Sequence, residues 1–292
     1  MKLTAAILLL MTCFLGNTFA QPISAEEPIK IIEVRVTNER FDLSGICAAD
    51  SSWYVVADKP RNHFLYKIDT NGNSASLQSK TDIALGGIID IEGVDYSGGK
   101  FFFIEERQSR VFLFHKKQTE QIPIQWGEFK PDTWGNRGFE GIAADEDKKL
   151  LFIGKERQPA KLFKLPITGG PIIEVFKGFS EKYDFHVSDI KIEGEYLYVL
   201  DRKNYRILKL DRDKEILIRA FDYSHILNHK GQKFYRKARY PMAEALLLTK
   251  SEIVIGLDNN GDSFNSDNRF VKQSELEGIN PVIIIFERPE FF

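Results

Sequence analysis

The sequence contains little cysteine, with two residues in 292. Cys13 lies in an N-terminal apolar segment, so Cys47 is the one cysteine left in the rest of the chain, and an internal disulfide is excluded there. We expect Cys47, within a predicted apolar strand, to be buried and unreactive. Charge of one sign is also missing, because 40 Lys and Arg stand against 42 Asp and Glu. A balanced charge gives no overall attraction to nucleic acid, which we exclude as a partner.

Long hydrophobic runs are confined to the first twenty residues. Lys2, the apolar stretch 3–16 and Thr18-Phe19-Ala20 have the pattern of a signal peptide cleaved between Ala20 and Gln21. No later run approaches the length of a membrane span. We predict a signal peptide over 1–20, a linker over 21–29 and one domain over 30–292, in a monomer that is periplasmic or secreted and has no transmembrane helix. An uncleaved anchor and a lipoprotein attached through Cys13 are the alternatives.

The common motifs of catalysis and nucleotide binding are absent as well. The sequence has no Gly-x-Ser-x-Gly elbow, no phosphate-binding glycine-rich loop, no Cys/His zinc spacing and no His-Glu-x-x-His. Its five histidines are scattered, which leaves a histidine-based triad open without indicating one. Motifs of this kind therefore assign no catalytic residue.

A repeat is present instead. The pattern Leu43-Ser44-Gly45-Ile46 returns in five copies, with second residues at 44, 92, 140, 188 and 244. In each copy a second apolar run follows and ends at an acid, and further strand-like runs come after it. The five acids are Asp58, Glu106, Glu156, Asp201 and Asp258, and the first four precede a base: Lys59, Arg107, Arg157 and Arg202.

Four strands in 48 residues is the size of one propeller blade. The last copy lacks a fourth strand, and the spare N-terminal run 30–36 would supply it by pairing with that copy. The sequence therefore predicts an all-β fold, a β-propeller of five four-stranded blades closed by the N-terminal strand. Six blades is the alternative, if residues 212–241 contain a degenerate blade.

Carboxylates recur at the positions that line a propeller channel. The second motif residues are Ser44, Glu92, Glu140, Ser188 and Glu244, with Asp189 next to the fourth. Like charges brought together require a cation or raise one another's pKa, and Ca²⁺ prefers oxygen ligands. The candidate calcium ligands are Glu92, Glu140, Glu244, Asp258 and Asp189. The alternative for the acids that end the second strands is neutralisation by the bases that follow them, without a metal.

A basic segment lies in the one expanded repeat, between Tyr223 and Tyr240. It contains no acid, and such clusters hold phosphate or other anions. We predict a small-molecule or envelope ligand at the channel, with anion contacts from Lys233, Arg236, Arg239, Arg157 and Arg107. A solvated loop is the alternative for the basic segment.

The repeats resemble the SdiA-regulated family of exported bacterial propellers, which is related to the phytase-like propellers with esterase-like activity. The resemblance rests on Asp90-Ile91-Glu92-Gly93-Val94, on Gly135–Ile142 and on Gly154-Lys155-Glu156-Arg157, and it extends over residues 30–288. It implies a periplasmic, metal-bound propeller, and its phytase-like relatives suggest hydrolysis of a phosphate or carboxylic ester. The fourth copy departs from the pattern, with Ser188-Asp189 in place of Glu-Gly. A non-enzymatic envelope binding module and a lactonase-like metal-dependent hydrolase are the alternatives.

Overall fold

The computed structural model describes residues 21–36, 40–59, 63–85, 90–237 and 242–292. The predicted signal peptide, Cys13 and the predicted anion contact Arg239 lie outside the described residues. No helix within the described residues is long and apolar enough to cross a bilayer.

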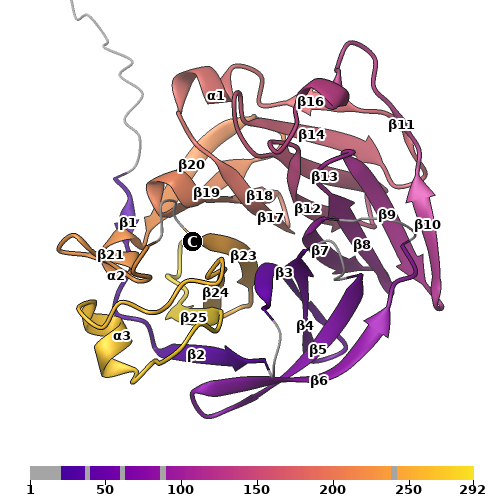
Figure 1. The fold of residues 1–292 in the computed structure, drawn as a ribbon. Helices are drawn as coiled ribbons and strands as arrows, with labels where there is room; N and C mark the ends of the chain where they lie inside the picture. The colour runs from indigo at the N-terminus through magenta and orange to yellow at the C-terminus, as the bar shows by residue number, and fades with distance from the viewer. Residues whose placement is uncertain (1–20, 37–39, 60–62, 86–89, 238–241) are drawn as a thin grey trace, which may run out of the picture.

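Four-stranded antiparallel groups follow one another along the chain and surround a common centre (Figure 1). The first four groups are β3 (Asp42–Ala49), β4 (Ser52–Asp58), β5 (Phe64–Asn71) and β6 (Ser74–Asp82); β7 (Ile91–Ser97), β8 (Lys100–Glu105), β9 (Arg110–His115) and β10 (Gln118–Ile122); β12 (Phe139–Asp145), β13 (Leu150–Lys155), β14 (Lys161–Pro166) and β16 (Ile173–Val175); and β17 (Val187–Glu193), β18 (Tyr196–Asp201), β19 (Arg206–Asp211) and β20 (Ile216–Asp222).

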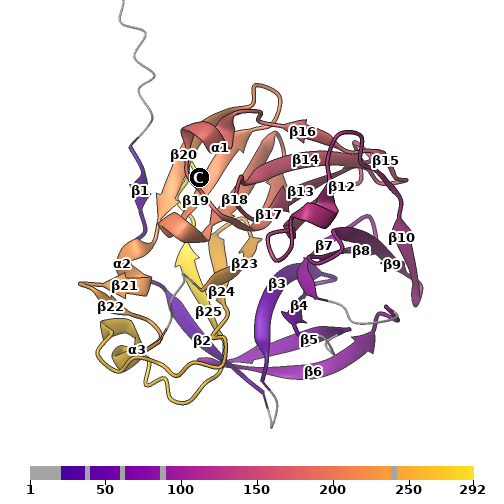
Figure 2. The same ribbon diagram turned by 45° about the horizontal axis from the view of Figure 1, so that its top comes forward.

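The final group joins the two ends of the domain. It contains β23 (Ala243–Leu248), β24 (Glu252–Leu257), β25 (Val282–Glu287) and the N-terminal strand β2 (Lys30–Arg35). β2 pairs antiparallel with β25, from Lys30 opposite Ile285 to Glu33 opposite Val282, and its other edge pairs with β6 (Figure 2). The predicted pairing of the N-terminal strand with the last repeat is therefore confirmed, and β2 leaves no open edge between the last and first groups.

The first strands of the groups form an inner ring. β3 contacts β7, β7 contacts β12, β12 contacts β17, β17 contacts β23, and β23 contacts β3. Alternate residues of each strand pack against opposite neighbours. In β8, Phe102 and Ile104 join the core shared with β12, while Phe103 joins the core that contains Cys47 and Val56. Cys47 is 1% exposed, and burial raises the pKa of its thiol well above the usual value, as expected for an unreactive cysteine.

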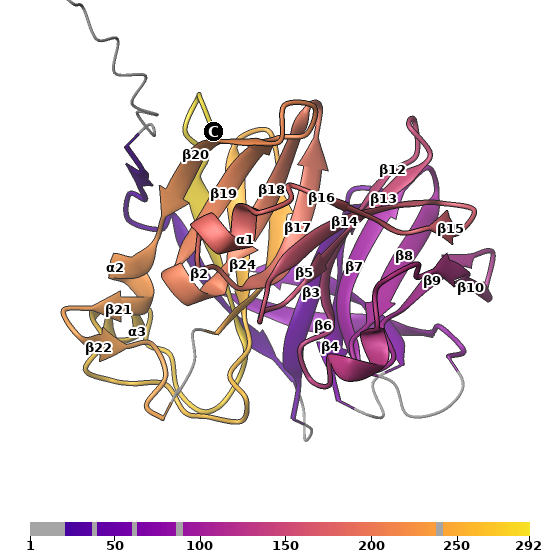
Figure 3. The ribbon, with the colours of Figure 1, turned by 90° about the horizontal axis from the view of Figure 1, so that it is seen from above.

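Short elements lie outside the four-stranded groups. They are β1 (Ile23–Ser24), β11 (Ile124–Gln125), β15 (Gly170–Pro171), β21 (Asn228–His229), β22 (Gln232–Lys233), the helices α1 (Phe179–Lys182), α2 (Ser224–Leu227) and α3 (Arg269–Gln273), and the 3₁₀ turns η1 (Pro131–Thr133) and η2 (Arg202–Asn204). β1 pairs with β20, so part of the predicted linker is an edge strand. α2, β21, β22 and α3 gather on one side, next to β2 (Figure 3), where Phe234 and Phe270 join the core that contains Ile31.

Candidate functional site

The repeated motif forms a β-bulge at the start of every inner strand. The pairing of each inner strand with its neighbour skips the second motif residue, with register shifts at 43/45, 91/93, 139/141, 187/189 and 243/245. A bulge leaves one residue unpaired and redirects its side chain. The motif glycine permits close packing at the same point, because a Cβ on Gly141 would lie 2.7 Å from the Ile190 nitrogen.

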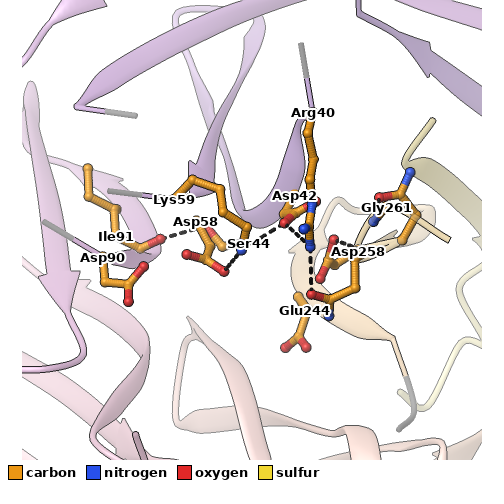
Figure 4. A network of polar contacts seen from close by, with 12 residues as sticks. Arg40, Asp42, Ser44, Asp58, Lys59, Asp90, Ile91, Glu244, Asp258 and Gly261 are labelled. Carbon is orange, nitrogen blue, oxygen red and sulfur yellow. Dashed lines mark hydrogen bonds and ion pairs between the residues drawn. The ribbon is translucent and has the colours of Figure 1, made fainter. Parts of the chain in front are cut away.

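A cavity of about 240 Å³ opens at this end of the inner strands. Its lining includes four of the redirected motif residues, Ser44, Glu92, Glu140 and Glu244. Three acids from the ends of second strands, Asp58, Glu106 and Asp258, also line it. Figure 4 shows Asp42, Asp58, Asp90, Glu244 and Asp258 within one group of polar side chains. The acids at the second motif position and the acids that end the second strands therefore line one cavity, with two exceptions. Glu156 and Asp201 are not among the lining residues, and neither is the motif residue Ser188.

One cluster combines Asp58, Asp90 and Glu92, and each offers an oxygen within 4.8 Å of the other two. Burial and a hydrogen bond with Asp90 raise the pKa of Asp58 to about 7. Burial would also raise the pKa of Asp90, but hydrogen bonds from Asp58 and Arg107 hold it below its usual value. Arg107 Nε lies 2.6 Å from Asp90 Oδ2, while Asp90 Oδ1 is buried without a hydrogen-bond donor among the described residues.

Glu92 is the least compensated member of this cluster. Among the described residues it has neither a hydrogen bond nor an ion pair. Burial and the nearby charges of Glu140, Asp58, Glu106 and Asp90 raise its pKa well above the usual value. Without a cation, the charged form of this carboxyl is therefore disfavoured.

A second cluster combines Glu106, Glu140 and Glu156, again with oxygens within 4.8 Å of one another. A guanidinium already lies in it: Arg202 pairs with Glu156, lies 3.9 Å from Glu140, and pairs with Glu244 from β23. Arg157 also pairs with Glu156. Burial raises the pKa of Glu106 to about 7, and its Oε1 accepts a hydrogen bond of 3.4 Å from the Gly138 N–H.

Acids outnumber bases throughout this region. Arg40 and Lys59 both lie 2.7 Å from Asp42 Oδ2, and Lys59 also pairs with Asp58. Burial and the charge of Asp42 raise the pKa of Asp258 well above its usual value. Nine carboxyl groups lie in and beside the cavity: those of Asp42, Asp58, Asp90, Glu92, Glu106, Glu140, Glu156, Glu244 and Asp258. Five cationic side chains pair with members of this set: those of Arg40, Lys59, Arg107, Arg157 and Arg202. Full ionisation would leave four negative charges in excess, so the cavity requires bound protons or a cation.

Asp189, one of the predicted metal ligands, lies outside the cavity. It is fully buried, accepts hydrogen bonds from the N–H groups of Ile190 and Leu246, and lies 3.2 Å from Lys191 Nζ. Lys191 also donates to the Val94 carbonyl on β7, at 3.1 Å. These bonds link β17 to β23 and β7, which is a bracing arrangement between inner strands. We leave Asp189 out of the proposed site for this reason.

Of the four predicted anion contacts that the structure describes, only Arg157 lines the cavity. Arg157 lines the cavity and pairs with Glu156, and Arg107 is 55% exposed at its side chain and pairs with Asp90. Lys233 is exposed in β22, and Arg236 donates to the Phe264 carbonyl in the segment that follows Asp258. In the loop Asp258–Asp262, side-chain oxygens accept hydrogen bonds from the backbone of the same loop. Asp258, for example, accepts one from the Asn260 N–H.

Asp42, Asp90 and Asn136 belong to the site and were missing from the predicted set. Asp42 and Asp90 each lie two residues before the second motif position, so an acid at that offset in the first two copies was a usable signal. Asn136 lies in a loop that approaches Glu106 through Gly138, where a Cβ would come within 2.2 Å of the Glu106 carbonyl oxygen. Nothing in the repeat indicates that approach.

Solved structures share this architecture at low sequence identity. A glutaminyl cyclase from Myxococcus xanthus matches 92% of this chain and 100% of its own, with 10% identity and a TM-score of 0.57. A luciferin-regenerating enzyme matches 83% of this chain and 77% of its own, with 11% identity and a TM-score of 0.50. Likeness at these identities shows the fold alone, which is all-β and propeller-like.

The sequence itself matches a family model over most of its length. The model of the SdiA-regulated family covers residues 27–225, which is more than half of the chain. The resemblance predicted from the repeats is confirmed by this match, and the chain belongs to the SdiA-regulated family.

Proposed function

We propose that this protein is an exported five-bladed propeller that binds a calcium ion in its central cavity and hydrolyses a phosphate or carboxylic ester. Five blades are supported by the five four-stranded groups and by the contacts that run from β3 around to β23 and back to β3. Between β20 and β23 the described residues form α2 and the two-residue strands β21 and β22, which is too little for a sixth blade.

The observation that carries the proposal is the cluster of Asp58, Asp90 and Glu92, in which Glu92 has no ion pair among the described residues. The three carboxylate oxygens lie within 4.8 Å of one another, so a single calcium ion with oxygen ligands at about 2.4 Å can contact all three. Neither His nor Cys lines the described part of the cavity, and an all-oxygen donor set favours a hard cation. Glu140, Glu244 and Asp258 are further acids in the lining of the same cavity.

A calcium ion held by Asp58, Asp90 and Glu92 would polarise a substrate oxygen and acidify a water molecule. Glu106, beside the cluster and with a pKa of about 7, is suited to exchange a proton with that water or with the leaving group near neutral pH. Arg157, which lines the cavity, and Arg107, which pairs with Asp90, would orient an anionic substrate, and Lys233, Arg236 and Arg239 stay proposed anion contacts.

The test uses the chain from Gln21 onward. We expect calcium to raise the melting temperature relative to EDTA, and to be required for hydrolysis of p-nitrophenyl phosphate or p-nitrophenyl acetate. Glu92→Gln should remove both effects, while Glu120→Gln, an exposed change on β10, should alter neither. Calcium binding without hydrolysis would favour the non-enzymatic envelope binding module. The absence of both would refute the proposal. Export is tested by cell fractionation with N-terminal sequencing.

A further inference from the structure

Arg202 is a buried cation at the centre of the second acidic cluster. Its side chain is 14% exposed, and it comes from η2, directly after β18. Its two terminal nitrogens contact carboxylates from three other elements: Glu140 on β12, Glu156 after β13 and Glu244 on β23. The guanidinium therefore lies where the carboxylates of neighbouring groups converge.

The first cluster is compensated differently. Lys59 pairs with Asp58 and Arg107 with Asp90, but their side chains are 31% and 55% exposed and approach from the rim. No base pairs with Glu92 among the described residues. The two clusters thus have the same donor chemistry, three carboxylates each, and differ in how deeply a paired cation is buried among them.

From this contrast, and resting on the calcium site proposed above, we propose that Arg202 takes the place of a second metal ion. The cavity then binds one calcium ion, at Asp58, Asp90 and Glu92, and Arg202 excludes another from Glu106, Glu140 and Glu156. A guanidinium carries one fixed charge and five directed donors, so it neutralises carboxylates without needing a metal supply.

Two carboxylate oxygens of the partners of Arg202 support a metal site that the guanidinium now blocks. Glu156 Oε2 and Glu244 Oε2 are buried without a hydrogen-bond donor among the described residues. Glu156 is fully buried, so this second oxygen is removed from water without a hydrogen bond in return. Removal of the guanidinium would leave these oxygens, with those of Glu106 and Glu140, as an unfilled oxygen donor set of the kind that calcium prefers.

The experiment counts calcium ions by titration calorimetry and by metal analysis after gel filtration. We expect one ion in the unmodified chain, two in Arg202→Met and one in Arg202→Lys, which keeps a cation. Arg206→Met is the matched control, because Arg206 on β19 pairs with the buried Asp201 at the end of β18, outside the cavity, and its loss should leave the count at one.

The outcomes separate the two proposals. No ion in the unmodified chain together with one in Arg202→Met would refute the calcium site of the proposed function and support the role of Arg202. One ion in both would overturn the role of Arg202 alone, and two in the unmodified chain would overturn it as well. Arg202→Met that is unfolded in EDTA should refold when calcium is added, because the ion replaces the missing charge. Failure to fold with and without calcium would overturn the inference.

Discussion

Ionisation of Glu106 should destabilise the metal-free protein at high pH. Glu106 is 2% exposed, and its folded-state pKa is about 7 against an ordinary value of 4.5. Between these two values the folded protein holds a proton that the unfolded chain has lost. Stability therefore falls as pH rises through this window, and the full cost is present above about pH 7.

The size of the effect follows from the shift. About 2.5 pH units, at 1.36 kcal/mol each, correspond to about 3 kcal/mol above pH 7 and to nothing below about pH 4.5. Glu106→Gln removes the titration, and its amide oxygen still accepts from the Gly138 N–H. The variant should therefore gain about 3 kcal/mol relative to the unmodified chain between pH 4.5 and pH 8.5, or roughly 6–12 °C in melting temperature.

Thermal unfolding in EDTA at both pH values measures this difference. The matched control is Glu120→Gln, an exposed carboxyl on β10, which should change the melting temperature equally little at each pH. A Glu106→Gln effect of the same size at pH 4.5 and pH 8.5 would refute the reasoning, because it would show that the carboxyl does not change its charge in this window.

Three further results are expected. Calcium should bind up to about tenfold more weakly for each pH unit below 7, since the ion displaces the proton of Asp58 whose pKa is about 7; a pH-independent constant between pH 5 and 7 would contradict this. Gly138→Ala should cost about 1–3 kcal/mol in urea unfolding, because its Cβ would lie 2.2 Å from the Glu106 carbonyl oxygen, and an unchanged midpoint would show that the loop shifts freely. Lys191→Met should lower the free energy of unfolding in urea by about 3–5 kcal/mol at neutral pH, because Asp189 stays buried without its cation. An unchanged free energy would mean that the N–H groups of Ile190 and Leu246 are sufficient partners for Asp189.

Much of the site was predictable because it is built from a repeat. A residue at a fixed place in each copy reaches an equivalent place around a closed ring, so Glu92, Glu140, Glu244 and Asp258 were expected together. Asp189 differs from these residues: it occupies the place of a motif glycine, one residue beyond the bulge, and its side chain contacts backbone N–H groups and Lys191.

The sequence by itself determined the strand pattern, the spare N-terminal strand and the supply of acids at the inner ends of the strands. Local properties carry that information: alternation of apolar residues, turn residues and a period of 48. Tertiary structure alone decided how the acids are compensated. Arg202 follows Asp201 in the same acid–base pattern as Lys59 and Arg107, yet it lies inside the ring while they stay at the rim. Which base enters depends on packing between neighbouring groups, and no spacing along one strand records it.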